Sequence, residues 1–85
     1  MSLNLHEFIE KYKPPREIFA DAIPTTQLNT YIYNDVYMSL TRAIKLSEIS
    51  VIWLIRNDHD PKDKIDIATL IHPKNRESLA RLSHF

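Results

Sequence analysis

Residues 35–57 read DVYMSLTRAIKLSEISVIWLIRN, and the predicted fold depends mainly on this stretch. Apolar residues stand where two short helices joined by a turn need them, at Leu40, Ile44, Leu46, Val51 and Leu54. Serine commonly caps helices, and Ser47 stands where a second helix would begin. Thr41 supplies a small side chain on the first helix. The stretch therefore predicts two short helices joined by a tight turn near Lys45.

This pattern resembles the helix-turn-helix of repressor and Cro-like DNA-binding domains, over roughly a quarter of the chain. Lys45 occupies the turn position that this family usually fills with glycine. The resemblance implies a DNA-binding transcriptional regulator whose second helix enters the major groove of duplex DNA. It also implies a homodimer, because one short recognition helix reads few base pairs. The residues expected to contact DNA are Thr41, Arg42, Lys45, Ser47 and Arg56.

The second predicted helix also suggests a different function, because it is rich in apolar residues. If Leu46, Val51 and Leu54 are buried, the outward positions are Glu48, Ile49, Ile52, Trp53 and Arg56. Each such apolar side chain left in water loses the roughly 1.5–3 kcal/mol of stabilisation that its burial would provide. Exposed apolar patches commonly mark partner surfaces. The alternative function is a protein-interaction module that binds and modulates a regulator or an enzyme. Its expected anchors are Ile49, Ile52 and Trp53.

A third interpretation makes residues 49–56 a buried strand, paired with residues 65–71 across the loop NDHDPKDK. Isoleucine, valine and tryptophan favour strands, and the first of these segments is apolar on both faces. Such a hairpin would give an α+β fold and would abolish the helix-turn-helix.

The rest of the chain favours helices. Asn4 and Glu7 fit a capping box, so a first helix is expected to begin there and to end before Pro14. Further helices are predicted after Pro15, over residues 26–33 with the next cap at Asn34 or Asp35, and beyond Pro73 and Asn75. The preferred fold is a single mainly helical domain, residues 1–85, forming a small bundle with a helix-turn-helix-like centre.

Composition excludes several functions. Eleven basic and eleven acidic residues give a net charge of zero, which is unlike a strongly basic nucleic-acid binder. Without cysteine there is no disulfide and no thiol nucleophile. Without glycine there is no phosphate-binding loop and no nucleophile elbow. We therefore expect no enzyme and no cofactor.

Two further expectations concern metal and membrane. Asp58 and Asp60 begin like a calcium loop, but Lys62 and Thr69 replace later ligands, so no metal site is expected. The longest apolar run, residues 49–55 interrupted by Ser50, is much shorter than the roughly 20 residues that span a bilayer. No signal peptide is apparent. A cytoplasmic protein without membrane contact is expected.

Overall fold

The computed structural model describes residues 2–33 and 36–75, and nearly all regular structure in these ranges is helical. The longer helices are α1 (Leu5–Tyr12), α2 (Thr25–Tyr33) and α3 (Leu40–Arg56). The shorter ones are α4 (Ile67–Leu70) and the 3₁₀ turns η1 (Arg16–Phe19), η2 (Pro61–Asp63) and η3 (Pro73–Asn75). The prediction of a small, mainly helical bundle is therefore confirmed.

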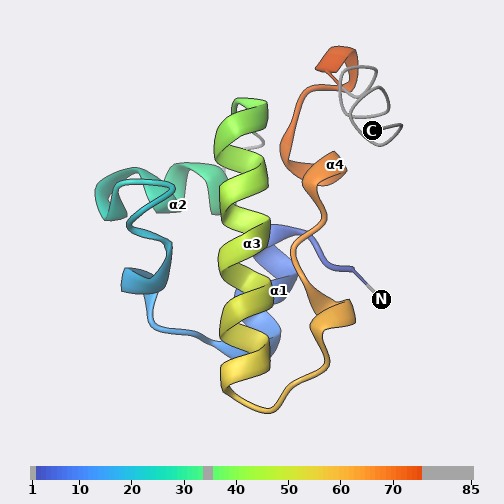
Figure 1. Ribbon diagram of the computed structural model, residues 1–85. Coiled ribbons are helices and arrows are strands. Elements are labelled where there is room, and N and C mark those ends of the chain that lie inside the picture. Colours follow the sequence, from blue (N-terminus) through green and yellow to red (C-terminus); the bar gives the residue numbers. More distant parts are fainter. Residues whose placement is uncertain (1, 34–35, 76–85) are drawn as a thin grey trace.

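Helix α3 stands at the centre of the molecule (Figure 1). Helix α1 lies behind it, and α2 lies to one side together with the turn that follows η1. The chain after α3 reverses direction and runs along the other side of α3 through η2 and α4 (Figure 1). Contacts join α3 to η1, η2 and α4, while α2 packs against α1 and η1.

The tight turn predicted near Lys45 is wrong, because α3 continues without a break for 17 residues. No proline or glycine lies between its ends, and Lys45 and Leu46 are good helix formers. Ser47 is a buried residue inside the helix and not an N-cap. The expected helix-turn-helix is thus replaced by one long helix.

The ends of α3 lie at residues that satisfy its free backbone groups. Ser39 is the N-cap, and its Oγ accepts a hydrogen bond from the Arg42 N–H at 3.3 Å. The cap predicted at Asn34 or Asp35 falls outside the described residues. At the other end, the His59 N–H donates to the Leu54 carbonyl at 2.8 Å, the longer bond of a Schellman motif. Asp58 takes the left-handed conformation there, a position usually occupied by glycine.

The hairpin alternative is also wrong. Residues 49–56 belong to α3, and residues 67–70 form α4. The segment between η2 and α4 makes only an isolated parallel bridge, in which Leu3 N donates to Lys64 O and Asp66 N donates to Leu3 O. Tertiary contacts override strand propensity here, because the core buries Ser50 and Leu54 and leaves Ile52 exposed, whereas a strand would place all three on one face.

The first half of the chain follows the predictions closely. Asn4 and Glu7 form the expected capping box, and α1 ends at Tyr12. Pro15 precedes the 3₁₀ turn η1 where a short helix was predicted. Helix α2 covers the predicted residues 26–33 and begins one residue earlier. The helix predicted beyond Asn75 lies outside the described residues.

One hydrophobic core draws residues from α1, η1, α2, α3 and α4 and from the chain between these elements. Its buried members are Leu5, Phe8, Phe19, Ala22, Ile23, Leu28, Ile32, Met38, Ala43, Leu46, Leu54, Ile65, Leu70 and Ile71. Only Ser47 and Ser50 are buried polar residues in the described part of the chain. Burial of this size sets the register of α3, whose inner side carries Ala43, Leu46 and Leu54.

A polar contact joins η2 to α1 at the edge of this core. Lys11 Nζ lies 2.8 Å from Asp63 Oδ2, and the Tyr12 hydroxyl donates to the same oxygen. These hydrogen bonds from Lys11 and Tyr12 hold the pKa of the Asp63 carboxyl well below its usual range. The same bond raises the pKa of Tyr12. The contact fixes the loop after α3 against the first helix.

The Ser50 hydroxyl connects α3 to the segment that runs beside it. Ser50 is fully buried, its Oγ donates to the Ser47 carbonyl at 2.6 Å, and it accepts from the Ile65 N–H at 3.0 Å. Replacing Ser50 by alanine leaves the buried Ile65 N–H without this acceptor. We expect Ser50→Ala to lower the free energy of unfolding by about 1–3 kcal/mol in urea denaturation. Thr69→Ala, at an exposed hydroxyl, is the control and should change it by no more than about 1 kcal/mol; equal losses would contradict a structural role for the Ser50 hydroxyl.

Candidate functional site

The outward side of α3 carries a row of apolar side chains that the described elements leave exposed or cover only in part. Ile52 is 51 % exposed and Ile55 is 58 % exposed, while Ile44 and Val51 are half-buried. The spacing of these residues places them along one side of a helix, away from Leu46 and the other core positions. We call Ile44, Val51, Ile52 and Ile55 the outer stripe of α3.

A shallow groove runs beside the outer stripe. It has a volume of about 360 Å³ and separates α3 from residues 64–67. The residues that line it are Ile44, Ser47, Glu48, Val51, Ile52, Lys64 and Ile67. Its walls are thus largely apolar, with one acidic and one basic side chain. No ion pair joins Glu48 to Lys64 or to any other residue that the structure describes.

The predicted partner-binding anchors lie in two different environments. Ile52 lies in the outer stripe, but Ile49 and Trp53 are half-buried and pack against the core. The Trp53 ring stacks on His59 at 5.6 Å and meets the ring of Phe8 edge-on at 5.9 Å. The prediction assumed a helix starting at Ser47. In the longer helix, Trp53 instead faces α1.

The predicted DNA contacts are likewise only partly brought together. Thr41, Lys45 and Arg56 are exposed residues of α3. Ser47 is 4 % exposed, so its hydroxyl is not available to bases. Arg42 is half-buried, and its Nη1 donates to the Tyr31 hydroxyl at 3.2 Å. The structure thus leaves three of the five predicted residues on an accessible surface.

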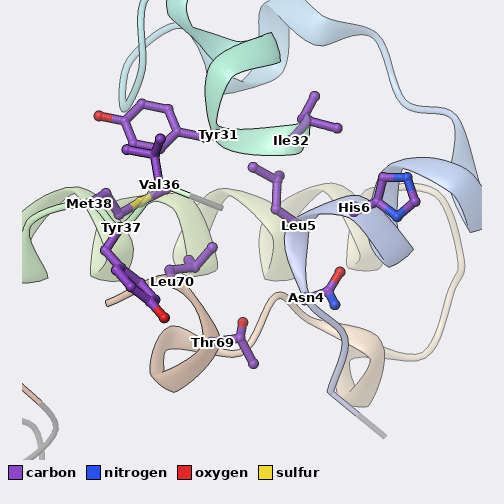
Figure 2. Close-up of a pocket in the computed structure, with 10 residues that line it drawn as sticks. All are labelled: Asn4, Leu5, His6, Tyr31, Ile32, Val36, Tyr37, Met38, Thr69 and Leu70. Carbon is purple, nitrogen blue, oxygen red and sulfur yellow. The ribbon is translucent and has the colours of Figure 1, made fainter. Parts of the chain in front are cut away.

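A second hollow, of about 330 Å³, lies on a different part of the molecule. Figure 2 shows that its walls come from four segments: the end of α2, the start of α1, residues 36–38, and α4. Its lining residues are Asn4, Leu5, His6, Tyr31, Ile32, Val36, Tyr37, Met38, Thr69 and Leu70. Leu5, Ile32, Met38 and Leu70 are buried, so the floor of the hollow is apolar.

Most polar groups at the rim of this hollow already have partners within the fold. Asn4 Oδ1 accepts from the Glu7 N–H at 2.8 Å, and Thr69 Oγ1 donates to the Asp66 carbonyl at 2.7 Å. The Tyr31 hydroxyl accepts from Arg42. His6 Nε2 lies 3.6 Å from Glu10 Oε1. These partners leave the hollow without a nucleophile and base in hydrogen-bond contact among its described lining residues.

The acidic residues after α3 act in the fold. Asp60 caps η2 through the Lys62 N–H at 2.9 Å, and Asp63 binds Lys11 and Tyr12. In the described ranges, His, Asp and Glu side chains form no group of three or more that could hold a metal ion. None of the helices in these ranges is long and apolar enough to cross a membrane.

Comparison of the chain with protein-family models, with curated proteins and with solved structures finds no match. The helices and the outer stripe define the class of protein, which is a small, mainly helical domain with an apolar stripe on its central helix.

The sequence interpretation missed Ile44, Val51 and Ile55 as surface residues, and Lys64 and Ile67 as the facing wall. The first three could have been found by continuing the helical period through Ser47 to Arg56. Lys64 and Ile67 could not, because their position depends on how the chain returns along α3.

The position of Trp53 leads to a prediction about stability. Trp53→Ala removes ring contacts to Phe8, Tyr12 and His59. We expect it to lower the free energy of unfolding by about 2–3 kcal/mol, measured by urea denaturation and far-ultraviolet circular dichroism. Ile52→Ala, on the exposed side of the same helix, should change it by about 0.5 kcal/mol or less. Equal losses for the two variants would contradict this assignment of inner and outer sides.

Proposed function

We propose that this chain is a protein-interaction module whose partner docks on the outer stripe of α3 and in the adjoining groove. The observation that carries the proposal is the exposure of Ile52 and Ile55 beside the half-buried Ile44 and Val51, on a single helix. Removing such side chains from water yields roughly 25 cal/mol per Å² of apolar surface. A contiguous apolar patch with polar residues around it is typical of partner surfaces.

Two features make this surface suited to docking. The inner side of α3 is fixed by the core, by the Ser50 hydrogen bonds and by both helix caps. A partner therefore meets an ordered surface and loses little free energy in ordering it. The groove adds the apolar side chain of Ile67 and the opposite charges of Glu48 and Lys64. These charges favour a partner segment that is apolar with polar flanks, such as an amphipathic helix.

The test introduces a photo-crosslinking amino acid at position 55 in cells that make the protein, identifies the crosslinked protein, and then purifies both for a binding titration. We expect Ile52→Asp to weaken binding of the purified pair roughly tenfold or more, because it places a charge in the apolar contact. The matched control is Thr30→Asp, at an exposed position of α2. Equal affinity of the two variants for the purified partner would refute docking at α3.

DNA binding is a second candidate function, and one observation favours it. Thr41, Lys45 and Arg56 share the exposed side of a helix about 25 Å long, and a continuous helix of this kind can lie in the major groove. Glu48 and Ile52 lie between them, and neither offers hydrogen-bond donors to phosphates or bases. Protein docking is therefore better supported than transcriptional control through DNA.

Titration of the protein with a labelled, mixed-sequence DNA duplex tests the second candidate. A DNA-binding helix should show an affinity that falls steeply as salt rises, and Lys45→Glu should weaken it further. Lys62→Glu, in the loop after α3, is the control for a general change in net charge. Binding that is absent at low salt, or equal losses for both variants, would exclude recognition through α3.

A further inference from the structure

Exposed charges follow a definite order along the outward side of α3. Glu48 lies four residues before Ile52, and Arg56 lies four residues after it. Reading from the first residue to the last, the signs are negative, apolar, positive. Lys45, Glu48, Arg56 and Asp58 make no ion pair with another residue that the structure describes.

This order is complementary to itself when reversed. If two copies of α3 pack antiparallel about a two-fold axis near Ile52, residues equally far before and after Ile52 lie opposite one another. Glu48 of one copy then lies near Arg56 of the other, one helical turn from the axis on each side. A parallel pair in register would instead place like charges together, which is unfavourable.

The apolar part of the stripe satisfies the same symmetry. Ile52 is 51 % exposed and would meet Ile52 of the second copy at the axis. Ile55 of one copy comes close to Val51 of the other, because a two-fold axis across the helices keeps the same flank of each helix on the same side. Apolar contacts therefore lie at the centre of the pair, and charges of opposite sign lie at its ends.

We infer that the first partner of the outer stripe is a second copy of this chain, bound through an antiparallel pair of α3 helices centred on Ile52. The inference rests on the proposed function, since it names the occupant of the same surface. Two helices about 25 Å long, packed at 8–10 Å, bury less than the roughly 800 Å² per partner of a standard interface. The dimer is therefore expected to dissociate reversibly in the micromolar range.

Charge reversal at Glu48 and Arg56 tests this arrangement directly, because both side chains are exposed and are not needed for folding. Sedimentation equilibrium of the whole chain, from low micromolar concentrations to about 1 mM, should show a monomer–dimer equilibrium. Glu48→Arg alone and Arg56→Glu alone should each weaken association roughly tenfold or more, because each turns both cross-pairs repulsive. The double variant Glu48→Arg/Arg56→Glu should associate like the original chain.

Mixing the two single variants gives the decisive result. One variant then presents two arginines and the other two glutamates, so both cross-pairs of the mixed dimer are attractive. We expect the equimolar mixture to form a heterodimer with an affinity near that of the original chain. Circular dichroism of each variant alone checks that it is folded.

Several outcomes would overturn the inference: an original chain that stays monomeric to about 1 mM, single variants that dimerise unchanged, or a mixture that does not recover association. A monomeric chain that still binds a different purified partner in an Ile52-dependent way would refute the second copy and leave the docking function intact. A chain that neither dimerises nor binds another partner in an Ile52-dependent way would refute the outer stripe as a docking surface.

Discussion

Burial of one side of α3 is the constraint on which the other elements depend. Ala43, Leu46 and Leu54 lie on this side, and the segments before and after α3 pack against it from both directions. The Ser50 hydroxyl adds the polar part of this contact, since it accepts the Ile65 N–H inside the core. Hydrophobic burial is non-directional and does not select a particular pairing of residues. The hydrogen bond is directional, so it specifies that Ile65 of the returning chain lies against Ser50 of α3.

The same constraint creates the proposed docking surface. A helix has room for about half of its side chains on a buried face, and α3 has more apolar residues than its inner side accommodates. Ile49 and Trp53 find places at the edge of the core, but Ile52 and Ile55 remain in water. Because the caps and the core hold α3 in place, these residues cannot turn inward. The exposed apolar row is therefore a fixed property of the described fold, and it is the basis of the proposed docking function.

The sequence suggests that Trp53 and Ile52 belong to one partner-binding surface, but the structure places them in two different environments. Trp53 joins Phe8, Tyr12 and His59 in a cluster that binds α1 to α3, so its function in the described fold is packing. Ile52, its neighbour in the chain, lies about 100° further around the helix and is exposed. The hollow between α1, α2 and α4 is a third surface, and its rim groups are mostly engaged within the fold (Figure 2).

Sequence alone determined the helical class, the capping box at Asn4 and Glu7, and the extent of α2, because capping and hydrophobic periodicity are local properties. It also marked residues 49–55 as too apolar for an ordinary surface helix. Only the tertiary structure decided that α3 runs through Lys45 and Ser47, since a serine can cap a helix or lie inside one according to what surrounds it. Tertiary packing likewise decided that Trp53 is covered while Ile52 and Ile55 are exposed, because the side that faces inward is set by α1 and by the return of residues 64–71.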